Sequence, residues 1–256
     1  MYQIDLNCDL GESFGSYKIG LDEEVISYIS SANVACGFHG SDPLVMSQTV
    51  ELAKNENVCV GAHPGLPDLV GFGRRNMDIS PKEAKAIVQY QIGALQSFCK
   101  AKKIKMHHVK PHGALYNMAG KDLNLALSIC EGIYEVNPDL ILLALSGSKM
   151  IDAAKKIGLK VAREAFADRA YEEDSSLVSR TKEGAMILDE NEAIKRVIRM
   201  IKEKKVKTIT GIDISIEVDS ICVHGDGIKA LEFVRKIKYS LEEENIKIVP
   251  LSKIIL

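Results

Sequence analysis

The fold is decided near the N-terminus by the stretch Asp5-Leu6-Asn7-Cys8-Asp9-Leu10-Gly11-Glu12. Apolar side chains at positions 4, 6 and 8 alternate with acids or an amide at positions 5, 7 and 9, which is the two-residue period of a β-strand. A half-solvated strand of an antiparallel sheet would show the same alternation. The choice between that fold and a buried strand therefore depends on the rest of the chain.

Polar residues recur wherever a later predicted strand runs into a loop. The recurrences are Asn33 with residues 36–42 (CGFHGSD), residues 61–64 (GAHP), residues 110–113 (KPHG), residues 164–169 (EAFADR) and residues 223–226 (VHGD). Polar groups gathered at the C-terminal ends of successive strands are how a parallel β/α fold builds an active site. The pattern therefore favours a parallel α/β fold.

Composition predicts one large α/β domain covering residues 1–256, because 46% of the residues are apolar and no Gly/Ser- or Pro-rich linker divides them. With a formal charge of −2 and no basic run flanked by aromatics, neither nucleic acid nor a membrane surface is expected as a partner. The chain shows no signal-peptide pattern, and its longest apolar run, residues 140–145, is too short to span a bilayer, which predicts a cytoplasmic protein. The six cysteines are scattered singly, so a disulfide framework is not expected.

Strands and helices alternate along the chain. Hydrophobic periodicity and capping signals predict helices from residue 22 and at 43–55, 80–98, 122–134, 148–157, 189–204 and 228–243, and strands at 32–35, 58–62, 106–109, 140–145, 160–165, 220–224 and 246–249. Residues 166–187 break the rhythm and are expected to form a loop that is either flexible or functional. Seven or eight β-α units in roughly 250 residues is the size of a closed or nearly closed barrel.

Residue parity predicts which side chains enter the lumen of such a barrel, because the opposite face of each strand must be apolar to pack against helices. The residues assigned to the lumen are Asp5, Asn7, Asp9, Cys59, Gly61, His63, His108, Lys110 and His224. Ionisable groups buried there cost on the order of several kcal/mol each unless they are paired or bind something charged. A lumen lined in this way indicates a barrel built for chemistry.

Three acidic residues of the first stretch receive different interpretations. Asp9 lies nearest the rim and is the best candidate for a general base or a metal-binding carboxylate, the alternative being a buried anchor for a loop. Asp5 is deeper and is predicted to be a structural hydrogen-bond hub. Glu12 is either a ligand or a solvated loop residue, and the sequence gives no basis for choosing.

Basic residues at the strand ends supply further candidates. His39 and His63 either converge with Asp9 on a divalent ion or hydrogen-bond and polarise a substrate carbonyl, since they lack the local H-x-x-H spacing of a zinc site. Lys110 and His112 are interpreted as an anion contact and an acid/base. The pair Arg74 and Arg75 either clamps an anion or forms a salt-bridged surface.

Seven ordered motifs together resemble the LamB/YcsF family, whose members act as the A subunit of the bacterial ATP-dependent 5-oxoprolinase. The motifs are residues 5–12, 33–43, 61–64, 72–75, 109–117, 164–171 and 222–226. The match runs nearly end to end, and the set is specific in a way that no single motif is. The resemblance implies a distorted seven-stranded parallel β/α barrel, related to polysaccharide deacetylases and some glycosidases.

The resemblance also implies ATP-dependent hydrolysis of 5-oxoproline (pyroglutamate) to L-glutamate. This chain would open the lactam, and two partner subunits would handle the ATP, in agreement with the lack of a G-x-x-x-x-G-K-[ST] phosphate loop. A divalent metal of unknown identity is a further candidate cofactor. On this hypothesis the catalytic residues are Asp9, His63, Lys110 and His112, the substrate-binding residues are Asn7, Asn33, His39, Arg75, Glu164, Asp168 and His224, and the metal candidates are Asp9, His39 and His63.

Two other classes of function remain open. A metal-dependent carbohydrate or amide deacetylase acting alone would need no ATP. If the chain were a non-catalytic lactam-binding subunit, replacing polar rim residues would leave the turnover of its complex unchanged. The many ionisable residues predicted in the lumen argue against this class, because binding so small a ligand needs few of them. The sequence leaves open whether copies of the chain form a homo-oligomer.

Overall fold

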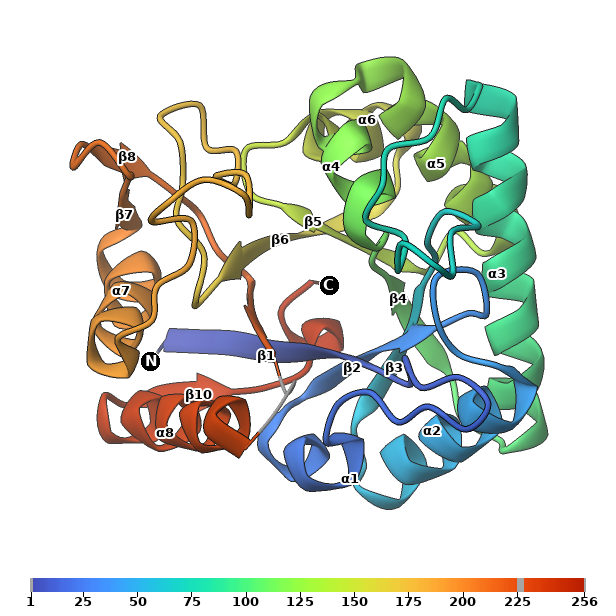
Figure 1. Cartoon of the computed structure of the whole chain (residues 1–256), viewed down its shortest axis with the longest axis horizontal. Coiled ribbons are helices and arrows are strands. Elements are labelled where there is room, and N and C mark those ends of the chain that lie inside the picture. Colours follow the sequence, from blue (N-terminus) through green and yellow to red (C-terminus); the bar gives the residue numbers. More distant parts are fainter. Residues whose placement is uncertain (1, 225–227, 256) are drawn as a thin grey trace.

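The computed structural model, in which residues 2–224 and 228–255 are described, is a ring of parallel strands surrounded by helices (Figure 1). Seven strands close the ring, because the last pairs back with the first. In order they are β1 (Tyr2–Leu10), β2 (Ser31–Ala35), β3 (Cys59–His63), β4 (Met106–Val109), β5 (Ile141–Leu145), β6 (Lys160–Phe166) and β9 (Ser220–Val223). The predicted seven-stranded parallel barrel is confirmed.

The barrel is distorted at β1, which has three partners at staggered heights. Its start pairs with β10 (Ile246–Ile248), its middle with β9 and its end with β2. The nine residues of β1 therefore reach from the base of the barrel to its mouth. This length places both Asp5 and Asp9 in one lumen at different depths.

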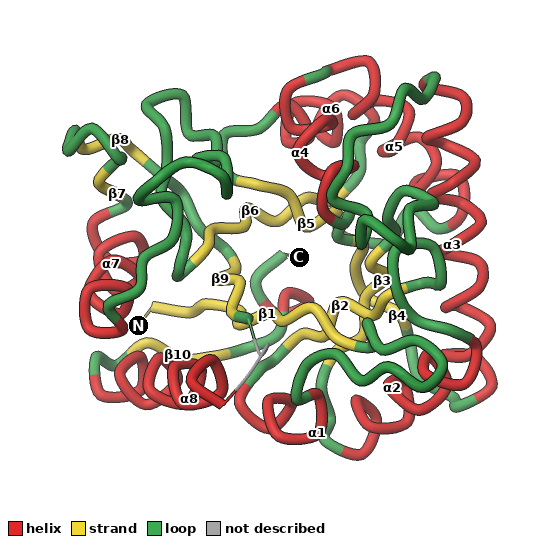
Figure 2. The backbone as a smooth tube through the Cα atoms, viewed as in Figure 1, coloured by secondary structure: helices red, strands yellow, loops and turns green. Residues whose placement is uncertain are grey.

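Helices cover the outside of the ring, as the red elements of Figure 2 show. They are α1 (Asp22–Val25), η1 (Ile26–Tyr28), α2 (Pro43–Asn55), α3 (Pro81–Ala101), α4 (Gly113–Lys121), α5 (Leu123–Val136), α6 (Lys149–Ile157), α7 (Glu190–Glu203) and α8 (Ile228–Glu243). The short helix η2 (Leu251–Lys253) instead lies within the outline of the ring in Figure 2, where Leu251 forms an apolar cluster with Ile141 and Leu143 of β5. The capping box of Ser80 and Glu83 is present, and the Asp42 carboxylate accepts the Leu44 and Val45 amides at the start of α2. No described helix is both long and apolar enough to cross a membrane.

Helix α4, the strands β7 (Lys205–Lys207) and β8 (Asp213–Ser215), and the short helix η2 were not predicted from the sequence. Helix α4 begins directly after the Lys110-Pro111-His112 motif, at Gly113, where φ is +51° and a Cβ would come within 2.6 Å of the Gly73 carbonyl oxygen. Only glycine fits there. Strands β7 and β8 form an antiparallel hairpin beside the barrel.

The predicted parity of the strands is confirmed. Ile4, Leu6 and Cys8 lie in the apolar core outside the ring, whereas Asp5 and Asn7 are completely buried within it. Gly61 also faces the lumen: a Cβ there would lie 2.2 Å from the His108 ring, so the close approach requires glycine.

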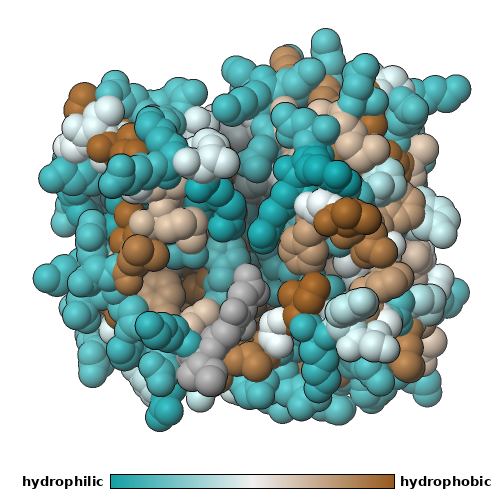
Figure 3. Space-filling view, viewed as in Figure 1, coloured by the Kyte–Doolittle hydropathy of each residue, from teal (hydrophilic) through white to brown (hydrophobic). Residues whose placement is uncertain are grey.

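Long loops after β1, β3 and β6 (blue, teal and gold in Figure 1) surround the opening of the ring. The space-filling view is hollowed near its centre, and hydrophilic side chains gather around the hollow (Figure 3). The loop at 166–187 is held in place, because the Phe166 amide donates to the Tyr171 hydroxyl oxygen at 2.9 Å and three side chains, Ala170, Val178 and Ala185, form an apolar cluster.

Candidate active site

The base of the lumen is a hydrogen-bonded hub around Asp5. Its carboxylate accepts from the hydroxyls of Ser30 at 2.7 Å, Ser31 at 2.6 Å and Ser220 at 2.5 Å. Burial raises the pKa of Asp5 to about 6, although the three hydroxyl bonds favour the ionised form. The predicted structural role of Asp5 is confirmed by these contacts.

Two asparagines connect this hub with the upper lumen. Asn33 donates to Asn7 Oδ1 at 2.8 Å and to Asp9 Oδ1 at 2.9 Å, and Asn7 donates to Ser220 Oγ at 2.8 Å. His108 Nε2 donates to Asn33 Oδ1 at 2.7 Å, and burial lowers the pKa of His108 to about 3, so its ring is neutral. Both asparagines were predicted to bind substrate, but these contacts favour a supporting role beneath the site.

Lys110 is a buried cation in the middle of the lumen. Its Nζ lies 2.9 Å from Asp9 Oδ1, 2.9 Å from Glu164 Oε1 and 3.2 Å from Asn7 Oδ1. Burial lowers the pKa of Lys110, but the negative charges of Asp9 and Glu164 outweigh burial and hold it well above the usual range. Tyr116, on α4, donates to Glu164 Oε2 at 2.5 Å and so completes the pairing of that carboxylate.

Asp9 is the lumen carboxylate that reaches solvent. Its side chain is 17% exposed, whereas that of Glu164 is completely buried. Its second oxygen lies 3.4 Å from His63 Nε2. Burial raises the pKa of Asp9, but its interactions with His63 and Lys110 outweigh burial and hold the pKa well below the usual range. Asp9 is therefore an ionised carboxylate that a small molecule at the barrel mouth can meet.

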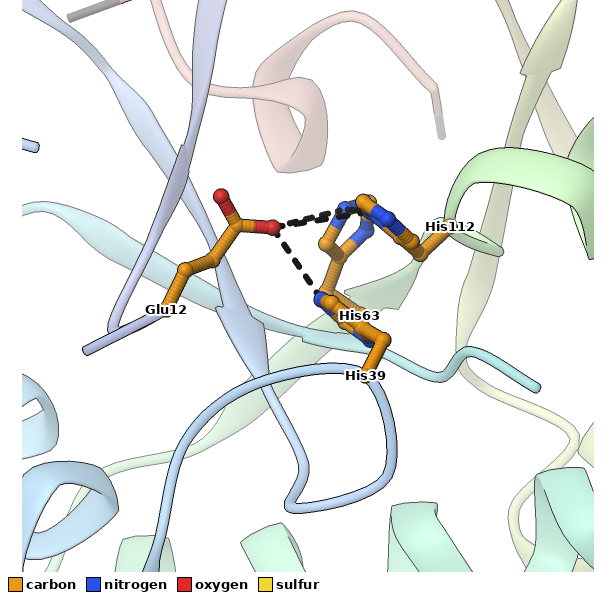
Figure 4. A group of neighbouring side chains, drawn as sticks. All are labelled: Glu12, His39, His63 and His112. Atoms are coloured by element: carbon orange, nitrogen blue, oxygen red, sulfur yellow. Dashed lines mark hydrogen bonds and ion pairs between the residues drawn. The ribbon is translucent and has the colours of Figure 1, made fainter. Parts of the chain in front are cut away.

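Beside Asp9, Glu12 and three histidines converge from the ends of β1 to β4 (Figure 4). Glu12 Oε1 lies 3.0 Å from His39 Nε2, 3.5 Å from His112 Nδ1 and 4.0 Å from His63 Nε2. His63 Nε2 and His112 Nδ1 are 2.8 Å apart. All four side chains are buried, so the structure answers the question that the sequence left open for Glu12.

The charge states of this cluster follow from its burial. Burial lowers the pKa values of His39 and His112 well below their usual range, and the charge of a neighbouring imidazole adds to the shift in each case. Burial raises the pKa of Glu12, although the charge of His112 opposes the shift. A buried acid beside the neutral imidazoles of His39 and His112 is an arrangement that a cation or a polar substrate would stabilise.

Across the mouth, His224 Nδ1 lies 2.9 Å from Asp168 Oδ2. Burial lowers the pKa of His224, but the negative charge of Asp168 outweighs it and raises the pKa overall. A ring nitrogen of His224 is within 4.8 Å of an Asp9 carboxylate oxygen and of Cys222 Sγ, so the pair faces the same space as Asp9. Gly225 and Asp226, which complete this motif in the sequence, lie outside the described residues.

The structure does not bring Arg75 to this cluster. Its side chain is 66% exposed and forms an ion pair with Asp68 in the same loop. Arg74 lies over the Phe72 ring, 4.9 Å from its centroid. His107, predicted to pack outside the lumen, is half-buried there.

Comparison with known proteins places this geometry in a family. Residues 4–256 match the model of the LamB/YcsF family. The chain belongs to that family. The relationship predicted from the seven motifs is thus confirmed, and this LamB/YcsF chain can be compared with individual relatives over its whole length.

A protein of Clostridium beijerinckii, named as the A subunit of 5-oxoprolinase, is 81% identical over 254 residues, covering 99% of this LamB/YcsF chain and 100% of the relative. A protein of Campylobacter jejuni subsp. doylei with the same name is 60% identical over 255 residues, covering 100% of both chains. A crystal structure described as a lactam utilization protein from Thermus thermophilus aligns with a TM-score of 0.92 and 44% identity, over 96% of this chain and 99% of that one.

Sequence reasoning left Glu12 undecided and missed Tyr116, although both belong to the site. Glu12 follows the end of β1, and its inward direction depends on the turn at Gly11, where φ is +70°. Tyr116 is one helical turn after His112 in α4, and the signal that could have found it is that spacing within the motif at residues 109–117.

Proposed function

We propose that this chain opens the lactam ring of 5-oxoproline in an ATP-dependent hydrolysis that yields L-glutamate. The observation that carries the proposal is the 81% identity, over 99% of the chain, to a protein named as the A subunit of 5-oxoprolinase. That name supports a multi-subunit complex, and we assign the ATP chemistry to two partner subunits because this sequence has no phosphate-binding glycine loop. We also propose that the reaction takes place in the cytoplasm, where ATP is supplied.

The chemistry explains why activation and ring opening are separate tasks. Resonance stabilises the lactam amide, and phosphorylation of its oxygen by the partners makes the ring carbon electrophilic. Water then adds to that carbon, the C–N bond breaks and the ring nitrogen takes a proton, leaving an acyl phosphate that a second water hydrolyses to glutamate and phosphate. The ring-opening subunit must therefore supply a base, an acid and positive charge.

The centre of the lumen supplies the base and the charge. Asp9 is ionised and reachable, so it takes the proton of the attacking water. Lys110, 2.9 Å from Asp9, provides a fixed positive charge for oxygen atoms that become negative during the addition. Glu164 and Tyr116 hold Lys110 in place from below, which costs no reorganisation during the reaction.

The pair His224 and Asp168 supplies the acid. Asp168 accepts a hydrogen bond from His224 Nδ1 and stabilises the protonated ring, which donates to the substrate through its other nitrogen. Because His224 and Asp9 border the same space, water can be deprotonated on one side of the substrate while the leaving nitrogen is protonated on the other.

Reconstitution with the presumed partner subunits tests this function. We expect glutamate to form only when this chain, both partners and ATP are present. The histidine cluster favours a second candidate, a metal-dependent deacetylase acting alone, which would release acetate from acetylated sugars without ATP and lose activity on chelation. Absence of glutamate with folded, complete partners would contradict the proposal.

A further inference from the structure

Glu12, His39, His63 and His112 form a cluster at the rim of the lumen, the rim cluster. Backbone carbonyls fix the tautomers of two of its histidines. His63 Nδ1 lies 2.7 Å from the carbonyl oxygen of Lys110, and His112 Nε2 lies 2.8 Å from the carbonyl oxygen of Phe72. A carbonyl oxygen can only accept, so these two nitrogens carry the hydrogens. In a neutral imidazole the opposite nitrogen then carries a lone pair. These nitrogens are His63 Nε2 and His112 Nδ1.

The two lone pairs face each other at 2.8 Å, and a carboxylate oxygen joins them. Glu12 Oε1 lies 3.5 Å from His112 Nδ1 and 4.0 Å from His63 Nε2. Three acceptors gathered in a buried space repel one another unless a cation or a proton lies between them. Their separations also suit ligands around one ion, because none exceeds twice a metal-ligand bond of about 2.1 Å.

His39 also belongs to the cluster, but its ring has the wrong orientation for a ligand of the same ion. The rings of His39 and His112 are stacked, with centroids 3.7 Å apart and planes 1° from parallel. A lone pair lies in the plane of its ring, so two stacked rings cannot both direct a lone pair at one ion about 2.1 Å away. The His63 ring is instead 88° from that of His112.

The orientation of His39 gives it a different task. Its Nε2 is 3.0 Å from Glu12 Oε1 and can donate to that oxygen, which turns the carboxylate toward His63 and His112. Carboxylates that bind metal are commonly oriented by such hydrogen bonds, and ligating histidines by bonds from their far nitrogen to a carbonyl. Both features are present in this cluster.

We propose that His63 Nε2, His112 Nδ1 and Glu12 Oε1 bind one divalent first-row transition metal ion, with His39 as a positioning residue. Two imidazoles and one carboxylate favour Zn²⁺, Co²⁺, Ni²⁺ or Fe²⁺ over Mg²⁺ and Ca²⁺. Asp9 Oδ2 is 3.4 Å from His63 Nε2, so the site adjoins the proposed base. The inference does not depend on the identity of the substrate.

Metal binding by the full chain tests the proposal. Protein purified without chelator would be analysed by elemental mass spectrometry, stripped, and titrated with Zn²⁺ and with Co²⁺, whose visible absorption reports its ligands. We expect about one ion per chain in the wild type. Loss of a ligand in Glu12→Gln or His112→Gln should weaken Zn²⁺ binding by more than about 100-fold, and His39→Gln by about 10- to 100-fold with the cobalt spectrum retained.

The controls separate a metal site from a proton-bridged cluster. His107→Gln removes an imidazole outside the lumen and should leave the affinity for Zn²⁺ unchanged. If a variant fails to fold, the wild-type stoichiometry and a rise of its melting temperature with added Zn²⁺ still decide the question. A wild type that binds neither ion at millimolar concentration overturns the proposal. A His39→Gln loss larger than that of His112→Gln overturns the ligand assignment.

Discussion

The polar lumen has two regions that differ in whether their hydrogen-bonding groups are matched. Around Asp5, at the base, each acceptor described above faces a donor, namely the hydroxyls of Ser30, Ser31 and Ser220. At the rim, acceptors face acceptors: His63 Nε2 and His112 Nδ1 are 2.8 Å apart. The base is complete by itself and stabilises the fold, whereas the rim needs something from outside the chain.

Lys110 joins the two regions, and its removal should have the largest effect. In Lys110→Met the carboxylates of Asp9 and Glu164 lose their buried cation, so the free energy of unfolding should fall by about 3–5 kcal/mol and glutamate formation should disappear. Urea unfolding and the reconstituted assay measure the two effects. Lys105→Met, at an exposed position, should change stability by less than about 0.5 kcal/mol. Equal stability of the two variants would show that Lys110 does not join the regions.

Protonation of Asp5 should make the base of the barrel sensitive to pH. Its pKa is about 6 in the folded chain and lies near 3.8 when unfolded, so the folded state holds the proton more tightly. The stabilisation is complete below about pH 4 and is lost as pH rises to about 6, a change of about 3 kcal/mol.

The variant Asp5→Asn isolates this contribution, because it keeps the shape of the side chain and cannot ionise. From pH 4 to pH 6, the unfolding free energy of the wild type should fall relative to that of the variant. Urea titrations at several pH values would measure this change. A difference that stays constant with pH would remove Asp5 from the account.

Tyr116 supports the boundary between the regions, and its loss should have a smaller effect. Tyr116→Phe removes the 2.5 Å hydrogen bond to Glu164 Oε2 and leaves that oxygen buried, which should cost about 1–3 kcal/mol of stability. Tyr134 is 41% exposed, so Tyr134→Phe is the matched control and should be close to neutral. Identical chemical denaturation of both variants would contradict a supporting role for Tyr116.

Replacing Asp168 should change the pH profile more than the maximum rate. Asp168 raises the pKa of His224, so the protonated acid persists to higher pH and activity falls as pH rises through that pKa. In Asp168→Asn this alkaline limb should move to lower pH. Asp174→Asn, on the same loop but exposed, should keep the wild-type profile. An unmoved limb in Asp168→Asn would exclude His224 as the acid.

The sequence predicted the base better than the rim, for a physical reason. Alternation along β1 is a local pattern, so parity alone places Asp5, Asn7 and Asp9 in the lumen. Glu12 and His112 lie beyond the strands, where glycine turns at Gly11 and Gly113 set their direction. No local pattern specifies those turns.

The same limit explains the other differences between expectation and structure. The stacking of His39 on His112 joins loops 73 residues apart in the chain, so only the closed barrel defines it. Arg75 forms an ion pair with Asp68 within one loop. From the sequence, Arg75 could equally have clamped an anion or formed such a surface ion pair. Helix α4 is short, and its start depends on the contact between Gly113 and Gly73.

Turnover of Asp9→Asn tests most directly the claim that the rim carries the chemistry. The variant removes the charge of the one described lumen carboxylate assigned as the base, and its amide can still meet Asn33 and Lys110. With both partners and ATP at neutral pH, we predict a fall in glutamate formation of about 10²- to 10⁴-fold while the variant remains folded. Near wild-type turnover by folded Asp9→Asn would contradict the account and place the base elsewhere.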